Sequence, residues 1–240
     1  MKELADVCRR NEAVRRKRLT SETVAAEIVG PYRRAKRRLL LFDYDGTLAP
    51  IRSRPEEAVP SHRLCELLRT LGTDAANRVV ICSGRDSGTL EKWFGGLPVS
   101  LAAEHGAFYK DRGAWRCNIR PASWDPKLSA LLEHFARKTP RSRIERKQTA
   151  LAWHYREADS WLGQLRAQQL VNALMPLCAR LNLHILQGDK VVEIKSPRFT
   201  KGSETLRLLR QERYDFILAL GDDTTDDDMF AALPPRALSI

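Results

Sequence analysis

Two aspartates close together in the sequence have the chemistry needed to cleave a phosphate ester. That reaction requires a nucleophile in line with the leaving oxygen, a proton donor for that oxygen, positive charge and fixed hydrogen-bond donors. Asp43 and Asp45 are two residues apart, and both can face one site if the chain leaves the extended form after Tyr44. Gly46 permits such a turn. We therefore predict that these two aspartates supply the nucleophile and the proton donor of such a reaction.

Polar residues elsewhere in the chain could supply the remaining parts of such a site. Asp222 and Asp223 offer carboxylate oxygens, which are hard ligands that suit Mg²⁺. Ser83 can donate a hydrogen bond to a phosphoryl oxygen, and Lys201 carries a positive point charge. The sequence thus contains the residue types for magnesium-dependent phosphoryl transfer, provided that the fold brings them together.

Most of these residues follow directly on apolar runs. Residues 39–42, 79–82 and 216–220 have the continuous apolar character of strands buried on both faces. Leucines at helical spacing, at 64–71 and 206–209, lie between them. The alternation predicts an α/β, Rossmann-like fold with a doubly wound parallel sheet. Because such sheets bind ligands at the carboxyl ends of their strands, we expect one composite site there.

The middle of the chain has a different pattern. A helix that begins near Trp124 is followed by two strands, one of them over 150–156, then a second helix over about 160–178 and two strands around 183–187 and 191–195. This order predicts a small α+β unit inserted into the sheet domain, where it would form a lid over the carboxyl edge. The predicted domains are a basic helical segment at 1–38, a catalytic core at 39–120 and 197–240, and an α+β cap at 121–196.

From Leu39 onward the chain resembles the haloacid dehalogenase superfamily of phosphotransferases. Four motifs carry the resemblance, in the order of that superfamily: Asp43-Tyr-Asp-Gly-Thr47, Ser83-Gly-Arg85, Lys201-Gly202 and Gly221-Asp-Asp-x-x-Asp226. Any one of them is common by chance, whereas four in order at strand ends are specific. The resemblance implies a phosphoaspartate at Asp43, and an Asp45 that first protonates the leaving group and then activates water.

The same resemblance implies roles for the other motif residues. The metal would be held by Asp43, the backbone carbonyl of Asp45 and Asp222, with Asp223 and Asp226 in supporting roles. The phosphoryl group would be bound by Thr47, Ser83, Gly84 and Lys201.

More specific segments resemble the trehalose-6-phosphate phosphatase family within this superfamily. They are Leu101-Ala-Ala-Glu-His-Gly106, Ile144-Glu-Arg-Lys147, Ala150-Leu-Ala-Trp-His-Tyr-Arg156, Val191-Val-Glu193 and the run 221–230. The resemblance implies a phosphoric monoester hydrolase of trehalose biosynthesis that uses Mg²⁺ to release phosphate from trehalose 6-phosphate. A sugar needs side chains that bind hydroxyl groups. We expect these to be Arg85, Glu104, His105 and Gly106 from the core and Lys190 and Glu193 from the cap.

Two other functions remain open within the same fold. One is another sugar phosphatase of the superfamily, which would share the catalytic motifs and differ in the cap. The other is a catalytically silent domain that regulates a trehalose-phosphate synthase. Silent domains are expected to lose a nucleophile or metal ligand, and Asp43, Asp45, Lys201 and Asp222 are all present. We therefore favour an active enzyme.

Parts of the chain are especially similar to the phosphatase half of two-domain proteins that carry a synthase in front. A synthase domain or subunit is therefore an expected partner. The family pattern usually continues beyond Ile240 for another strand and helix, so a truncated carboxyl terminus is a further alternative.

The net charge of +11 comes largely from the start of the chain. Residues 1–38 hold 12 Lys and Arg against 5 Asp and Glu, without the interleaved aromatics of an RNA-binding motif. Such runs are usually solvated helix faces, so we do not expect nucleic-acid binding. Two alternatives for this segment stay open: nucleic-acid binding, and a remnant of the linker to a synthase domain.

Other features of the composition point to a cytoplasmic protein. No apolar run approaches the roughly 18 residues of a membrane span, and no apolar signal segment opens the chain. Five scattered cysteines without a CxxC pair predict neither a disulfide framework nor a zinc site.

Overall fold

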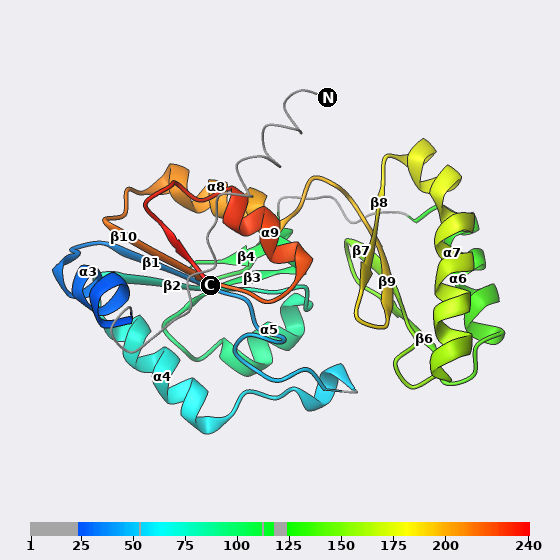
Figure 1. Ribbon diagram of the computed structural model, residues 1–240, viewed down its shortest axis with the longest axis horizontal. Helices are drawn as coiled ribbons and strands as arrows, with labels where there is room; N and C mark the ends of the chain where they lie inside the picture. The colour runs from blue at the N-terminus through cyan, green and yellow to red at the C-terminus, as the bar shows by residue number, and fades with distance from the viewer. Residues whose placement is uncertain (1–23, 53, 112, 118–123) are drawn as a thin grey trace.

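Two β-sheets, each packed on its own hydrophobic core, make up the part of the chain that the computed structural model describes, residues 24–52, 54–111, 113–117 and 124–240. Figure 1 shows them side by side. We call the seven-stranded sheet with its helices the core, and the four-stranded sheet with its two helices the cap. Most of the basic segment and the predicted start of the cap at Pro121 lie outside the described residues. The domain boundaries given above stay a proposal.

The core sheet has the strand order β11-β10-β1-β2-β3-β4-β5. Its strands are β1 (Arg38–Phe42), β2 (Asn77–Cys82), β3 (Ser100–Ala103), β4 (Phe108–Lys110), β5 (Arg116–Cys117), β10 (Phe216–Leu220) and β11 (Leu238–Ser239). The strands from β11 to β3 are parallel, which confirms the predicted α/β fold. β4 and β5 add an antiparallel edge that the sequence did not predict.

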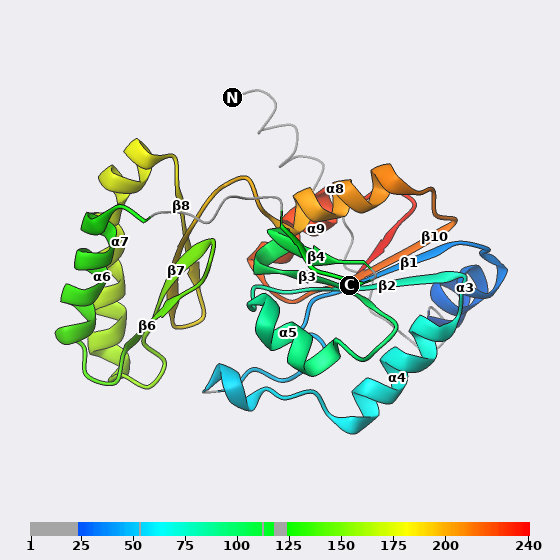
Figure 2. The same ribbon diagram turned by 180° about the vertical axis from the view of Figure 1, so that it is seen from behind.

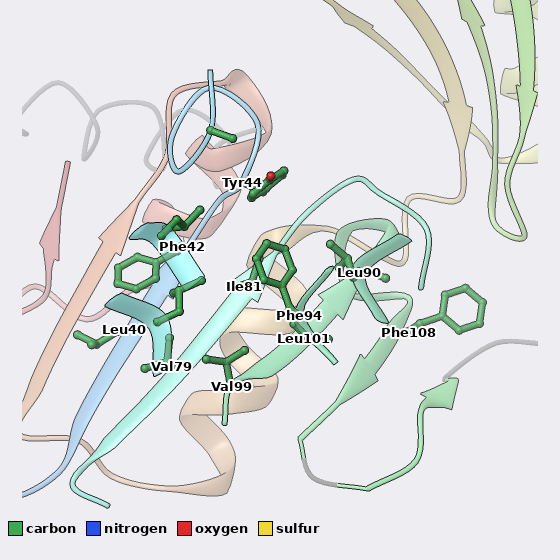
Figure 3. Packing of buried hydrophobic residues seen from close by; sticks show 14 of the residues in the cluster. Leu40, Phe42, Tyr44, Val79, Ile81, Leu90, Phe94, Val99, Leu101 and Phe108 are labelled. Atoms are coloured by element: carbon green, nitrogen blue, oxygen red, sulfur yellow. The ribbon is translucent and has the colours of Figure 1, made fainter. Parts of the chain in front are cut away.

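After the polar residues that open β1 and β2, the central strands are apolar, because helices cover both faces of the core sheet (Figures 1 and 2). Along β1, Leu40 and Phe42 pack with α4 (His62–Thr73) and α5 (Ser87–Phe94), as Figure 3 shows in part. The intervening Leu39 and Leu41 pack on the other face with α8 (Lys201–Gln211) and α9 (Thr224–Ala231). Each such buried side chain contributes about 1.5–3 kcal/mol relative to an exposed one.

Four shorter elements also belong to the described part of the core. They are the helical turns η1 (Val24–Val29), η2 (Pro55–Glu57) and η3 (Glu104–Gly106), and the short helix α3 (Gly30–Arg34). Within the described ranges, none of the helices combines the length and the apolar character that crossing a membrane requires.

The cap sheet is antiparallel, in the order β6-β7-β9-β8. Its elements are α6 (Pro126–Arg137), β6 (Arg143–Arg146), β7 (Ala150–His154), α7 (Ser160–Leu181), β8 (His184–Gly188) and β9 (Val191–Lys195). α6 and α7 cover the face of this sheet that is turned away from the core (Figures 1 and 2). Trp153 is fully buried among them. The opposite face, which carries polar side chains, is directed toward the core.

Strand register brings the polar residues to one edge of the core sheet. Phe42 pairs with both Leu220 and Ile81, and Cys82 pairs with Ala102, so the central strands end at the same level. The residues that follow these ends, including Asp43 and Ser83, therefore meet beneath the cap. This is the placement that the parallel-sheet interpretation predicted.

Candidate active site

A cavity of about 880 Å³ lies between the carboxyl edge of the core sheet and the polar face of the cap sheet. This volume lies within the range of small-molecule sites. The core contributes, among others, Asp43, Asp45, Ser83, Gly84, Arg85, His105, Lys201, Asp222 and Asp223. The cap contributes, among others, Arg143, Glu145, Lys147, His154, Arg156 and Glu193. Charged and polar side chains from segments far apart in the sequence thus share one cavity.

Lys201 joins two buried carboxylates at the floor of the cavity. Its Nζ lies 2.6 Å from Asp43 Oδ1 and 2.7 Å from Asp226 Oδ1, and all three side chains are buried. Lys201 is placed here because Thr200 and Ser203 form a capping box that starts α8 at this residue. Burial alone would lower the pKa of Lys201, but Asp43 and Asp226 raise it above its ordinary value, so it stays charged.

Burial disfavours the charged form of Asp43 more strongly than Lys201 favours it. Desolvation raises its pKa to about 7 even though the charge of Lys201 favours the carboxylate. A nucleophilic carboxylate benefits from this partial desolvation, because a poorly hydrated oxygen attacks phosphorus more readily. The Asp43 backbone N–H donates to the Leu220 carbonyl, which fixes the residue at the strand end.

Three aspartates form an acidic cluster with the composition of a magnesium site. Oxygens of Asp43, Asp222 and Asp226 lie within 4.8 Å of one another. Asp226 is already engaged, because Oδ1 accepts from Lys201 and Oδ2 accepts from the backbone N–H groups of Asp222 and Asp223. Asp43 and Asp222 therefore remain as the candidate metal ligands. Their hard oxygen donors fit Mg²⁺.

The turn after Asp43 shapes the place where a metal would sit. Gly46 has a φ of +94°, and a Cβ at that position would lie 2.0 Å from Asp222 Oδ2. Only glycine allows this approach. Thr47 donates a hydrogen bond of 3.0 Å to Asp222 Oδ1. Thr47 thus orients a candidate metal ligand and is not among the residues that line the cavity.

Asp45 is held by Arg85 in a two-pronged ion pair. Arg85 Nε lies 2.8 Å from Asp45 Oδ2, and Nη2 lies 2.6 Å from Oδ1. The guanidinium of Arg85 also lies 4.6 Å from the ring centre of Trp93, which holds it by a cation–π contact. Both partners line the cavity, so an incoming phosphate would compete with Asp45 for Arg85.

The loop after β2 lies against the core histidine. Ser83 is buried, and its Oγ accepts from the Arg85 backbone N–H, which leaves its hydroxyl proton free to face the cavity. A Cβ on Gly84 would lie 2.9 Å from His105 Nε2, so a larger residue here would displace the imidazole.

His105 faces two charged residues of the cap across the cavity wall. Its Nε2 lies 3.7 Å from Glu193 Oε1, and Lys147 Nζ lies 3.5 Å from Glu193 Oε2. His105 Nδ1 and Glu193 Oε1 are buried without a hydrogen-bond partner among the described residues. Groups buried in this way need partners, and sugar hydroxyls could provide them.

Burial lowers the pKa of His105 to about 4 from an ordinary value of 6.5. Between these values the unfolded chain binds a proton that the folded chain does not bind, so the free energy of unfolding falls as the pH drops from about 6.5 to 4. Asparagine tolerates the left-handed backbone of residue 105, where φ is +59°. In His105→Asn we therefore expect the acid-induced fall in free energy of unfolding to be smaller by roughly 3 kcal/mol. Denaturant unfolding of both proteins at pH 4.5 and 7.5 measures it. An equally steep decline in the variant would contradict a neutral, buried imidazole.

The structure places the other predicted residues as follows. Asp223 lines the cavity and also caps α9, accepting from the Thr225 N–H at 3.2 Å. Lys190 is partly exposed and donates to Ser160 Oγ at 3.1 Å, and it is not among the cavity-lining residues. Glu104 and Gly106 are buried beside the cavity but are not in its lining. Sugar binding by these three residues stays a prediction.

The cap also brings to the cavity residues that sequence reasoning did not select. Lys147 is nearly inaccessible, and its Nζ donates to the Gly84 carbonyl at 2.9 Å. His154 lines the cavity with Glu145, and the His154 Nε2 and Glu145 Oε2 atoms lie 2.7 Å apart. The alternation along β7 was the available signal, because it places His154 on the face opposite buried Trp153.

Comparison with known proteins agrees with this geometry. A family model for trehalose-phosphatase matches residues 41–239. The trehalose-phosphatase of Zygosaccharomyces rouxii is 43% identical over 84% of this chain and 25% of its own length. The bifunctional trehalose-6-phosphate synthase/phosphatase of Thermoproteus tenax is 39% identical over 96% of this chain and 32% of its own. The chain thus spans a quarter to a third of these curated relatives.

A solved structure gives the same result. The carboxyl-terminal domain of Candida albicans trehalose-6-phosphate phosphatase has a TM-score of 0.80 and 39% identity, covering 85% of this chain and 76% of that one. Fold, strand-end motifs and relatives agree, which confirms the resemblance found in the sequence. The chain belongs to the trehalose-phosphatase family.

Proposed function

We propose that this chain hydrolyses trehalose 6-phosphate to trehalose and phosphate through a phosphoaspartate. One observation carries the proposal: Asp43 and Asp45 line the same cavity as Lys201 and Asp222. Membership of the trehalose-phosphatase family supports the choice of substrate. The cap supports a sugar ligand, since it brings charged side chains over the reacting carboxylates.

In the proposed reaction, Asp43 attacks the phosphorus, and the bond from phosphorus to the sugar oxygen breaks. Asp45 gives its proton to the leaving oxygen, which departs as a hydroxyl of trehalose. Asp45 then takes a proton from water as that water attacks the phosphoaspartate, and Asp43 is released with inorganic phosphate. Asp45 must leave its ion pair with Arg85 to make these transfers, and phosphate binding to Arg85 would release it.

Groups at the floor of the cavity would balance the negative charge of the phosphoryl group. Lys201 and the Ser83 hydroxyl would hold phosphoryl oxygens, while Asp226 keeps Lys201 in place. Mg²⁺, held by Asp43, Asp222 and the Asp45 backbone carbonyl, would supply further neutralising charge. At the sugar end, His105, Lys147 and Glu193 would replace the hydration of the hydroxyl groups.

The substrate is tested by comparing phosphate release from trehalose 6-phosphate, glucose 6-phosphate and sucrose 6-phosphate, with and without Mg²⁺. Selective, metal-dependent release from trehalose 6-phosphate is the expected result. Preference for a different sugar phosphate would support the proposed mechanism but contradict trehalose 6-phosphate as the substrate. No release from a folded sample would instead favour a silent domain that regulates a synthase.

Metal binding can be tested without any activity. A ligand that binds the folded chain alone stabilises it by RT ln(1 + [L]/Kd), about 2.7 kcal/mol at a hundred times Kd. We expect millimolar Mg²⁺ to raise the melting temperature by a few degrees, and Asp222→Asn to abolish most of that rise. Ca²⁺ and Na⁺ at equal ionic strength serve as controls for screening. A rise that persists in Asp222→Asn would place the ion elsewhere.

A trehalose-phosphate synthase domain or subunit is the partner we propose, in the cytoplasm. The support is that relatives covering nearly all of this chain include a protein named as a bifunctional synthase/phosphatase, which is about three times as long. Such a partner would produce the sugar phosphate that this chain consumes.

A further inference from the structure

Glu104 reaches from the core to the cap and does not enter the cavity. Its side chain is buried, although a carboxylate at a strand end would ordinarily be solvated. Its Oε2 accepts from the Thr149 N–H at 2.8 Å and from the Thr149 hydroxyl, and its Oε1 accepts from the Gln148 N–H at 3.3 Å. One carboxylate thus receives three donors, all from the cap.

These donors form the tip of a cap hairpin. Lys147 donates its backbone N–H to the Ala150 carbonyl at 2.9 Å, which closes a two-residue turn between β6 and β7. The N–H groups of the two turn residues, Gln148 and Thr149, lie outside the strand ladder and need an acceptor when they are buried. Glu104 supplies that acceptor from the other body of the protein.

The core holds Glu104 in an unusual backbone conformation. Glu104 and His105 have φ values of +46° and +59°, in the left-handed region that non-glycine residues seldom occupy. Their backbone N–H groups donate to the carbonyls of Arg85 and Ser83, each at 2.9 Å. The loop that carries the phosphate-binding motif therefore fixes the turn that carries Glu104. Strain of this kind persists where the surrounding structure requires it, commonly at functional sites.

The contact positions the cap side chains of the cavity. Lys147 directly precedes the turn that Glu104 binds, and its Nζ lies 2.9 Å from the Gly84 carbonyl. Lys147 in turn contacts Glu193, which faces His105. If the hairpin tip left Glu104, Lys147 and Glu193 would move away from the core edge together, because β6, β7 and β9 form one sheet.

We propose that Glu104 is a positioning residue that docks the β6–β7 hairpin on the core and so brings Lys147 and Glu193 to the substrate. The docking itself is independent of the proposed function, whereas its effect on sugar-phosphate turnover rests on it. Glu104 acts through the cap and does not touch the reacting atoms. Phosphate esters too small to reach the cap should therefore depend on it little.

The test uses Glu104→Gln, which keeps the shape and removes the charge. Glu91→Gln is the matched control, because Glu91 accepts from Lys110 and Trp115 within the core alone. We expect kcat/KM for trehalose 6-phosphate to fall roughly 10- to 100-fold in Glu104→Gln, the range for lost charged hydrogen bonds, mainly through KM. Hydrolysis of p-nitrophenyl phosphate should change less than about threefold. Glu91→Gln should leave both substrates unaffected.

Hydrogen exchange gives a second readout that needs no turnover. The Gln148 and Thr149 amides should exchange at least about tenfold faster in Glu104→Gln than in the wild type or in Glu91→Gln. Glu104→Asp, which keeps the charge but is too short to reach the hairpin, should behave like Glu104→Gln. Unchanged exchange at these two amides, or equal losses on both substrates, would overturn the proposal. If the wild type hydrolyses only p-nitrophenyl phosphate, trehalose 6-phosphate is not the substrate. The hydrogen-exchange measurement would still test whether Glu104 docks the β6–β7 hairpin.

Discussion

Replacing Asp43 by Asn is expected to lower phosphate release from trehalose 6-phosphate by about 10⁴-fold or more while leaving the fold intact. The amide has the same shape and can still accept a hydrogen bond from Lys201, so the buried contact at 2.6 Å has a substitute. The amide oxygen is a poor nucleophile and cannot form the acyl phosphate. Steady-state phosphate release and the melting temperature, measured on the same preparation, separate loss of chemistry from loss of fold.

A matched control comes from the same cavity. Asp86 also lines it, but its carboxylate caps α5, accepting from the Thr89 N–H at 2.9 Å. Asn caps helices nearly as well, so Asp86→Asn should retain activity within about threefold. Acid-quenched wild-type enzyme should carry a phosphoryl group on the peptide that contains Asp43. A tenth or more of wild-type activity in Asp43→Asn would show that another residue is the nucleophile.

The central part of the fold could be predicted from the sequence, because strands buried on both faces consist of consecutive apolar residues. β1 and β2 each contain a run of four consecutive apolar residues, β10 is apolar throughout, and each strand ends at a motif. The edge strands β4 and β5 were not predicted, because short strands at the rim of a sheet need few apolar residues. The order of elements in the cap was predicted because α6 and α7 bury apolar residues at helical spacing, and because β7 and β9 are short runs rich in apolar residues.

The floor of the site could be predicted from sequence in the same way, whereas the cap side could not. Asp43, Ser83 and Asp222 are placed by strand ends whose register is set by the core sheet. Lys147 directly precedes a hairpin turn, where a lysine is ordinarily solvated, and its side chain becomes buried only because the cap packs on Gly84, 63 residues away. Glu104 was predicted to bind sugar, and its partners are two backbone N–H groups and a threonine hydroxyl of the cap, which no residue pattern reveals.

Replacing Lys201 by Met should have the largest combined effect on activity and stability. The methionine fills the space but leaves Asp43 and Asp226 buried without their shared cation. Removing one partner of a buried ion pair costs about 3–5 kcal/mol in free energy of unfolding. The loss of a fixed positive charge at the phosphoryl oxygens should lower the rate by about 10²–10³-fold. Denaturant unfolding and phosphate release measure the two effects.

The pH dependence identifies the source of the instability. The pKa of Asp43 is already raised by burial to about 7, and it should rise further once Lys201 is gone. A carboxyl whose pKa is higher in the folded than in the unfolded state makes the protein less stable as the pH rises toward the folded pKa. In the wild type this loss is complete near pH 7, whereas in Lys201→Met it continues to higher pH. The difference in free energy of unfolding between the two proteins should therefore grow above pH 7. Adding Asp226→Asn removes one of the two stranded carboxylates and should restore part of the stability. Because neither change returns a cation to the phosphoryl group, activity should stay low in the double variant. Recovery of activity along with stability would instead mean that Lys201 serves the fold alone.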